Sequence, residues 1–222
     1  MTLLTYQPPL DPYLDILHQD EAIIVANKPP GLLSVPGKDP AHYDALSSRL
    51  ARVWPSTRII HRLDMATSGL LVFALYKSAQ AHLQRQFERR QVHKRYRALV
   101  AGQLPARAGT IELPLRCDWP NRPRQMVDLS LGKFACTHYQ TVQVQTVAGA
   151  VQTEVLLTPY TGRSHQLRVH MQSLGTPILG DKFYAHPAAF AASSRLCLHA
   201  EELGFYHPET EQWLSFNLPA AF

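Results

Sequence analysis

Cysteine is scarce in this sequence, because only three of its 222 residues are cysteines. Cys117, Cys136 and Cys197 lie far apart, so no Cys-x-x-Cys pair exists that could begin a zinc ribbon. An odd number of widely spaced cysteines also gives no support to a disulfide framework. We therefore expect buried free thiols in a reducing cytoplasm.

Long apolar runs are missing as well. No stretch approaches the roughly 20 apolar residues that cross a bilayer as a helix, and Met1–Thr5 has neither the basic start nor the apolar core of a secretory signal. The composition, 45% hydrophobic and 18% charged, is that of a soluble globular protein. The sequence predicts a cytoplasmic protein without membrane contact.

The motifs of nucleotide-dependent and hydrolytic enzymes do not occur. There is no Gly-x-Gly-x-x-Gly and no phosphate-binding Gly-x-x-x-x-Gly-Lys-Ser/Thr, so nucleotide-cofactor chemistry is unsupported. No Gly-x-Ser-x-Gly elbow is present. His165 and His170 are not four residues apart and enclose no glutamate, which excludes a zinc-protease helix.

Acidic residues are nearly absent from residues 49–97, where eleven Lys/Arg face only Asp64 and Glu88. A concentrated basic segment raises the local concentration of a polyanion such as RNA. A solvated basic surface that serves solubility explains the same charge equally well.

Short apolar or alternating segments predict a largely β protein with three helices. The predicted strands are Glu21–Asn27, Leu70–Tyr76, Lys94–Ala101, Thr137–Val147, Val151–Thr158, Leu196–Tyr206 and Trp213–Leu218. Pro-Pro-Gly at 29–31 should end the first of them, because proline lacks an N–H and glycine accepts a turn.

The three helices are predicted from caps and periodicity. Asp44 should cap a helix whose apolar positions are Leu46, Leu50, Val53 and Trp54. Ser78 should cap a second, with Ala79, Leu83 and Phe87 on one face and Arg85, Arg89 and Arg90 on the other. Residues 163–174 should form a third, stopped by Gly175 and Pro177.

No internal repeat or Pro/Gly/Ser-rich linker divides the chain, so we expect one α+β domain over residues 1–222. Residues 115–124 read as a stiff basic loop with one tryptophan, Trp119. Arginines interleaved with an aromatic ring suit RNA loops, whose splayed bases stack on rings and guanidinium planes. A rigid surface loop without a ligand is the alternative.

Two segments concentrate groups that could do chemistry. The first is Ile59–Val72, in which the three polar or charged residues His61, Arg62 and Asp64 precede a Thr-Ser-Gly turn and a buried strand. Asp64 is the sole acid between Asp44 and Glu88, and nearby positive charge should keep its carboxylate ionised. A structural aspartate that caps the turn or pairs with Arg62 fits the same pattern, and spacing alone does not decide.

The second segment is Thr161–His170. On a helix, Arg163, Leu167 and His170 would share one face, and Arg163 in the first turn could reach out to a carboxylate.

Taken together, these segments resemble the RluA family of pseudouridine synthases. His61–Leu70 resembles the family signature, Asn27–Gly31 its first motif and Lys94–Ala98 the segment of the active-site tyrosine, while Thr161–His170 resembles the third motif and Leu198–Ala200 a late Leu-His-Ala strand. The five motifs occur in the family's order over residues 27–200, with Ser164 where many members have threonine and Pro30 at a variable place. Only 26 residues precede Asn27, so we expect no N-terminal S4-like domain.

The resemblance implies a fold and residue roles. The fold would be the pseudouridine synthase fold, a mixed, largely antiparallel central sheet flanked by helices and loops, with an active-site cleft across the sheet. Asp64 matches the catalytic nucleophile, Arg163 the arginine that pairs with it, and Tyr96 the tyrosine that packs on the uracil. Leu167 matches the apolar side chain on the ring's other face, and Arg62 and His61 would bind substrate beside the site.

The resemblance also implies the reaction and its partners. The chain would isomerise uridine to pseudouridine without a cofactor or metal, as a monomer without an obligatory protein partner. Similarity to the short dual-specificity members, which includes residues 117–123, implies the uridine at position 32 of the tRNA anticodon loop and the stem-loop uridine at position 746 of 23S ribosomal RNA. An rRNA-only synthase of the same family and a non-catalytic RNA-binding or ribosome-assembly protein are the alternatives.

Overall fold

The computed structural model describes residues 6–222, which gather into two compact units. The first unit comprises Met1–His93 and Ala200–Pro219, and the second comprises Lys94–His199 and Ala220–Phe222. Residues 1–5, used above to argue against a secretory signal, lie outside the described residues. The single domain over residues 1–222 stays a prediction.

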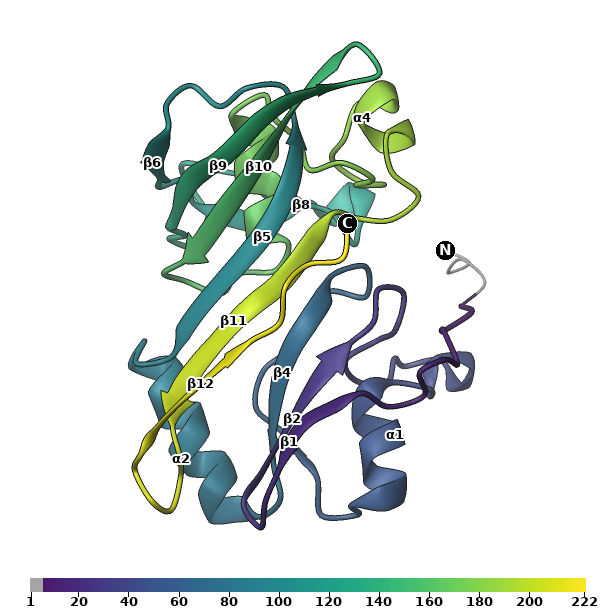
Figure 1. Ribbon diagram of the computed structural model, residues 1–222, viewed down its shortest axis with the longest axis vertical. Coiled ribbons are helices and arrows are strands. Elements are labelled where there is room, and N and C mark those ends of the chain that lie inside the picture. Colours follow the sequence, from purple (N-terminus) through teal and green to yellow (C-terminus); the bar gives the residue numbers. More distant parts are fainter. Residues whose placement is uncertain (1–5) are drawn as a thin grey trace. The chain divides into compact units, whose positions relative to one another are not determined.

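The first unit is built on antiparallel strands. They are β1 (Ile16–Gln19), β2 (Ile23–Lys28), β3 (Arg58–Ile59), β4 (Ser68–Ala74), β11 (Leu198–Tyr206) and β12 (Trp213–Asn217). Their order is β1-β2-β4-β11, with β12 paired to β11 and β3 to β4. Figure 1 shows β1, β2 and β4 side by side. β2 ends at Lys28, directly before the Pro-Pro-Gly turn, as predicted.

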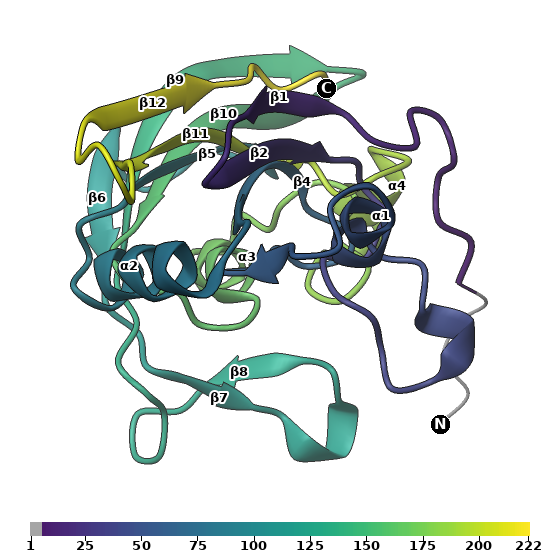
Figure 2. The ribbon, with the colours of Figure 1, turned by 90° about the horizontal axis from the view of Figure 1, so that it is seen from below.

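Two helices cover one face of these strands, α1 (Leu46–Val53) and α2 (Lys77–Glu88), as Figure 2 shows. α2 is amphipathic as predicted, because Ala79 and Leu83 are buried in the unit's core and Phe87 packs against that core. The core also contains Val25 of β2 and Val72 of β4. The α2 arginines at 85 and 89 are exposed.

The cap predicted for α1 is wrong. Ala45 holds the N-cap position, and its backbone N–H donates to Ser48 Oγ at 2.8 Å. The carboxylate of Asp44 instead accepts from the fully buried Arg49, at 2.7 Å from Nε and 2.8 Å from Nη2. A buried guanidinium needs a carboxylate partner more than a helix end needs a cap. Val53, expected on the apolar face, is 56% exposed.

The cap predicted for α2 is also wrong. Tyr76 stands at the N-cap without a side-chain hydrogen bond, so Ser78 lies inside the first turn. β4 ends only two residues before α2 begins, and this short connection sets where the helix starts.

The second unit contains another set of antiparallel strands. β5 (His93–Ala101), β10 (Ala150–Pro159), β9 (Thr137–Val147) and β6 (Ala108–Ile111) lie in the order β5-β10-β9-β6. β9 has the predicted bounds, β5 begins one residue earlier than predicted, and β10 extends one residue further at each end. The antiparallel pairings and flanking helices in both units confirm the predicted α+β fold class.

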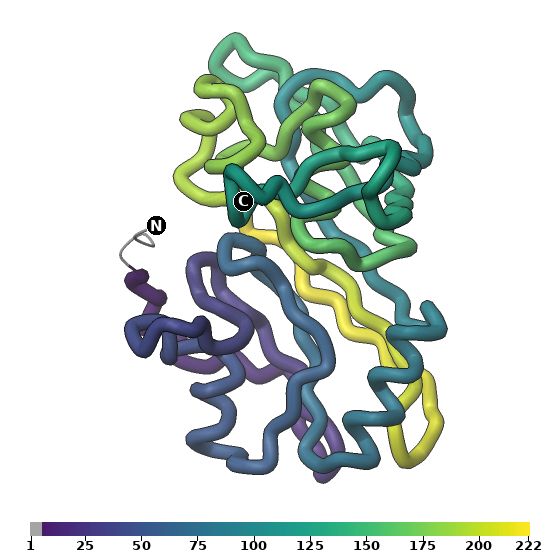
Figure 3. The backbone as a smooth tube through the Cα atoms, turned by 180° about the vertical axis from the view of Figure 1, so that it is seen from behind, coloured from purple at the N-terminus to yellow at the C-terminus, as the bar shows by residue number. Residues whose placement is uncertain are grey.

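A separate hairpin, β7 (Leu115–Cys117) and β8 (Gln125–Val127), faces the sheet of the second unit across α3 (Gln166–Ser173). Figure 3 shows the chain of this hairpin on the near side of its unit. Val169 of α3 packs with Leu115 and Val127 of the hairpin, which joins these two layers. A short helix, α4 (Pro187–Ala191), follows.

The structure thus corrects two further predictions. Residues 115–124 form the first arm and the tip of a hairpin and not a single loop, because Leu115 is buried against α3 and pairs with Val127 of the second arm. The third helix begins at Gln166 and not at 163, since His165 adopts a left-handed backbone with φ of 53°. Cys136 and Cys197 are buried free thiols, whereas Cys117 is only half-buried.

Within residues 6–222, no helix is long and apolar enough to span a membrane.

Candidate active site

Asp64 lies in the loop that connects β3 to β4, with its side chain half-buried. The backbone on its N-terminal side is fixed by Ser34, whose Oγ donates to Leu63 O at 2.8 Å and accepts from Leu63 N–H at 3.1 Å. On the other side the loop closes as a turn, in which Thr67 N–H donates to Asp64 O at 3.1 Å. The carboxylate therefore stands on a backbone held from both directions.

Lys28 holds the residue after Asp64. It is fully buried at the end of β2, and its Nζ donates to the carbonyl oxygens of Pro29 at 2.9 Å, Leu32 at 2.7 Å and Met65 at 2.9 Å. Gly31 N–H reaches the same Met65 oxygen at 2.8 Å. The Asn-Lys-Pro-Pro-Gly segment thus holds the Asp64 loop through hydrogen bonds to its backbone.

Gly69 begins β4 where another backbone passes very close. A Cβ at this position would lie 2.3 Å from the carbonyl oxygen of Ala200 on β11, and φ is +113°. Only glycine tolerates both the contact and the backbone conformation. The close packing of Gly69 against Ala200 explains why glycine follows Thr67 and Ser68. It also shows that the Leu-His-Ala strand packs directly against the end of the Asp64 loop.

His61 and Arg62 differ in their surroundings. His61 Nε2 accepts a hydrogen bond from Val72 N–H at 3.2 Å, and its ring stacks on Phe87 with 4.6 Å between centroids. These contacts orient His61 as part of the loop's support, and its predicted role in binding substrate stays a prediction. The side chain of Arg62 is exposed.

Tyr96 lies in the second unit, in the middle of β5. It is paired in register with Leu157 of β10, so both side chains lie on the same face of the sheet. That face also carries Ala98 and Val155, which are both fully buried. Tyr96 is half-buried, whereas Leu157 is fully buried.

Arg163 lies in an extended turn before α3 and is exposed. Its Nε donates to Phe134 O at 2.9 Å, which fixes the direction of the guanidinium. Its backbone N–H donates to Gln166 Oε1 at 3.0 Å. Since the helix begins three residues later, Arg163 shares no helix face with Leu167 and His170, contrary to the prediction.

Gln166 organises this turn, and sequence reasoning missed it. Its Oε1 also accepts from Thr161 Oγ1 at 2.7 Å, while its Nε2 donates to Cys136 O and to Thr137 Oγ1, both at 3.0 Å. A glutamine that is 4% exposed and fully hydrogen-bonded is a structural hub. The segment offers no distinct signal for this residue, because α3 also buries the polar side chains of Arg168 and His170.

Leu167 and His170 lie on the buried side of α3. Leu167, in the first turn, is 7% exposed. His170 is fully buried between Thr137 Oγ1, 2.9 Å from its Nδ1, and Leu113 O, 3.0 Å from its Nε2. Burial lowers the pKa of His170 below its ordinary value, so the ring is neutral and structural.

The candidate residues therefore fall into two sets. His61, Arg62 and Asp64 occupy one loop of the first unit, and Tyr96, Arg163 and Leu167 occupy a strand, a turn and a helix of the second. Among residues 6–222 no group of three or more His, Cys, Asp or Glu side chains is arranged to hold a metal ion.

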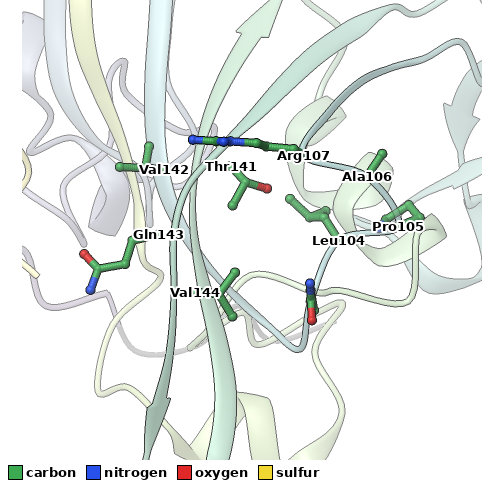
Figure 4. Close-up of a pocket in the computed structure, with 9 residues that line it drawn as sticks. Leu104, Pro105, Ala106, Arg107, Thr141, Val142, Gln143 and Val144 are labelled. Atoms are coloured by element: carbon green, nitrogen blue, oxygen red, sulfur yellow. The ribbon is translucent and has the colours of Figure 1, made fainter.

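A cavity of about 360 Å³ in the second unit lies away from these residues (Figure 4). Residues 103–107 and 141–144 line it, among them Leu104, Val142, Val144 and the charged Arg107. Its lining contains no carboxylate and no histidine, so it offers no group for acid–base chemistry.

Comparison with known proteins identifies a family for this chain. Residues 22–173 match the family model described as RNA pseudouridylate synthase, a span that contains Asp64, Tyr96, Arg163 and Leu167. Among solved structures, Human RNA Pseudouridylate Synthase Domain Containing 1 is similar with a TM-score of 0.77 and 31% identity, covering 93% of this chain and 83% of that one. Human RNA Pseudouridylate Synthase Domain Containing 4 has a TM-score of 0.74 and 27% identity, covering 93% and 88%.

Curated proteins are similar over the full length. A protein of Pasteurella multocida (strain Pm70) named "Dual-specificity RNA pseudouridine synthase RluA" is 54% identical, covering 100% of both chains. The protein of the same name from Escherichia coli (strain K12) is 50% identical, again over 100% of both chains. A family match over most of the chain and identity at this level have one explanation: this chain belongs to the RNA pseudouridylate synthase family.

Proposed function

We propose that this RNA pseudouridine synthase has dual specificity and converts an anticodon-loop uridine of tRNAs and a stem-loop uridine of 23S ribosomal RNA. The observation that carries the proposal is the 54% identity, over the whole length of both chains, to a relative named as a dual-specificity enzyme. If the chain were an rRNA-only enzyme of the same family, we would expect an equally high sequence identity to relatives named as rRNA-only enzymes.

The proposed catalytic site combines one group from the first unit with three from the second. Asp64 is the nucleophile, Arg163 pairs with its carboxylate, and Tyr96 and Leu167 hold the two faces of the uracil. In support, hydrogen bonds to the carbonyls of Leu63 and Met65 fix the backbone on both sides of Asp64.

The hydrogen bonds of Arg163 also favour this pairing. Phe134 O occupies Nε, while the described residues supply no hydrogen-bond partner for the two Nη atoms. A guanidinium held at Nε presents its remaining donors in a fixed plane, which suits a carboxylate. Arg163 would keep Asp64 ionised and orient it.

The chemistry needs no outside reagent. The N1–C1′ bond of uridine breaks, the uracil turns, C5 bonds to C1′, and the C5 proton leaves while N1 gains one, so the product is an isomer of the substrate. Asp64 either attacks C1′ to form an ester or assists elimination to a glycal. A carboxylate that attacks the anomeric carbon has precedent in retaining glycosidases. In this proposal Tyr96, packed on the uracil, takes up the C5 proton.

The target base must leave its stack before it can react, which costs a few kcal/mol and is cheapest in loops. Exposed arginines of residues 49–97 can offset this by contacting phosphates, and Arg62 can fill the space left by the base. Not every cation of that segment is available: Arg49 is buried against Asp44, and Arg97 pairs with Glu154. The exposed cations of the segment are Arg52, Arg58, Arg62, Lys77, Arg85, Arg89 and Arg90.

Mapping pseudouridine in tRNA and 23S rRNA from a strain that lacks this gene tests the substrate pair. The proposal predicts loss at the anticodon-loop site and at the rRNA site, with both restored by the wild-type gene. Persistence of the anticodon-loop modification in the deletion strain would identify an rRNA-only enzyme. Sedimentation of the purified protein tests the accompanying proposal that it acts as a monomer, and an RNA-free dimer would contradict it.

A further inference from the structure

The tip of the β7–β8 hairpin exposes a large aromatic side chain on a rigid support. Trp119 begins a short 3₁₀ turn, Trp119–Asn121, and is 62% exposed. The turn is closed by backbone hydrogen bonds from Asn121 N–H to Asp118 O at 3.0 Å and from Arg124 N–H to Asn121 O at 3.1 Å. The tip is therefore ordered without burying its tryptophan, which leaves the indole accessible to a ligand.

One face of the indole is already occupied. The guanidinium carbon of Arg122 lies 4.6 Å from the ring centroid, and Arg122 Nε donates to Trp119 O at 3.3 Å, which holds the cation over the ring. Among residues 6–222, no other ring or cation is stacked on Trp119. A flat indole with one covered and one open face is suited to receive a planar base.

The charge around the tip favours a polyanion. Arg122 and Arg124, both within the tip, form no ion pair with a carboxylate in the described part of the chain. The hairpin and the turn after it contain two acidic residues, and both are engaged elsewhere. Asp118 accepts from Asn121 Nδ2 at 3.0 Å, and Asp128 pairs with Arg116 and caps the turn at residues 130–131. A partner that brings both aromatic surface and negative charge is single-stranded RNA.

The hairpin is also linked to the turn that carries Arg163. Gln125 N–H donates to Tyr184 Oη at 2.7 Å, and the guanidinium of Arg124 lies 5.6 Å from the Tyr184 ring centroid. Tyr184 Oη is in turn 2.7 Å from Nδ1 of His165, two residues from Arg163. A base bound at the tip would thus be held at a defined position relative to Arg163.

We propose that Trp119, backed by Arg122, is a stacking site for an unpaired base of the substrate RNA, distinct from the uridine that reacts. This rests on the proposed function, since it adds a second nucleotide contact to the same RNA. Stacking is tolerant of base identity, so one platform serves loops of different sequence. That property suits an enzyme that acts on two unrelated RNA loops.

The test compares Trp119→Ala and Trp119→Phe with Trp213→Ala, a control that removes a tryptophan 46% exposed on β12 in the first unit. Dissociation constants are measured by anisotropy of a labelled tRNA anticodon stem-loop, and turnover by tritium release from the same RNA. Trp119→Ala should bind about tenfold more weakly, equivalent to about 1.4 kcal/mol. Trp119→Phe should keep most of the affinity, Trp213→Ala all of it, and kcat at saturating RNA should stay within about twofold of wild type.

Two results would overturn the proposal. The first is an affinity of Trp119→Ala within twofold of wild type, which would show that the exposed tryptophan binds a protein partner or no partner. The second is a loss confined to kcat, which would make the residue structural. Failure of the proposed function is a separate result: wild-type protein would then bind the stem-loop without releasing tritium.

Discussion

Lys28 Nζ donates a 2.9 Å hydrogen bond to the carbonyl oxygen of Met65, the residue that follows Asp64. A fully buried lysine thus positions the loop of the proposed nucleophile through its backbone, without touching the substrate. Because the same ammonium group also holds the carbonyls of Pro29 and Leu32, the first motif and the Asp64 loop are one structural piece.

Replacing Lys28 with methionine should therefore damage both stability and activity. Each buried carbonyl left without a partner costs about 1–3 kcal/mol, so we expect the free energy of unfolding to fall by about 3 kcal/mol. Urea denaturation measures this loss. The control is Lys38→Met, because Lys38 is exposed, and it should change the free energy of unfolding by less than about 0.5 kcal/mol. Equal stabilities of the two variants would contradict the role given to Lys28.

Gly69→Ala should be among the most damaging small substitutions in the chain. The added Cβ would lie 2.3 Å from Ala200 O, so β4 or β11 must move, and we expect a loss of at least about 3 kcal/mol of stability.

Gly149→Ala is the matched control for Gly69→Ala. Its φ is +80°, but nothing lies within 4 Å of the new Cβ, so only backbone strain of about 1 kcal/mol is expected. Thermal unfolding of both variants separates the steric effect from the conformational one. Similar melting temperatures for the two would show that the Ala200 contact is unimportant.

Gln166→Met should loosen the turn that carries Arg163. The substitution keeps the size of the side chain but removes its hydrogen bonds to Thr161, Arg163, Cys136 and Thr137. We expect about 3 kcal/mol less stability and, at temperatures where the variant is folded, about tenfold lower kcat in tritium release. Gln172→Met, on the exposed side of the same helix, should leave both unchanged. A Gln166→Met protein with the stability and kcat of wild type would contradict the role of Gln166 in holding the turn that carries Arg163.

The stability of the protein should fall as the pH is lowered through the range where histidine titrates. Burial lowers the pKa of His170 from 6.5, so the unfolded chain binds a proton that the folded protein resists. His170 therefore contributes nothing to this slope above pH about 6.5 and opposes folding increasingly below it.

His170→Gln should flatten the pH dependence of unfolding between pH about 7 and 5, although the variant is less stable overall. The measurement is urea denaturation across this range, with His138→Gln, exposed on β9, as control. An unchanged slope in His170→Gln would show that another group controls the pH dependence.

The sequence predicts most of the fold, because the strands carry their own signals. β9 matches its predicted bounds because alternation and the flanking turns mark both ends. The helix starts were wrong because they depend on tertiary contacts. Asp44 is drawn to buried Arg49, and the left-handed His165 delays α3, and neither can be read from local propensity.

For the site, the sequence motifs predict which residues would face the reaction, but not the contacts that hold their backbone in place. Lys28, Ser34 and Gln166 act through backbone carbonyls and buried hydrogen bonds, and their partners are up to 37 residues away in the chain. Such pairings become visible only when the chain is folded. His61 was expected at the substrate, and its described contacts are with Val72 and Phe87.

Asp64→Asn is the variant that tests the central claim most directly. The substitution removes the nucleophile's charge while preserving its shape, and the anchors at Leu63 and Met65 act on the backbone, so the loop should keep its position. The measurement is tritium release from C5-labelled uridine in tRNA and 23S rRNA transcripts, with RNA affinity measured in parallel. We predict no release from either RNA with affinity close to wild type. Release at a rate near wild type would contradict the assignment of Asp64 as the nucleophile.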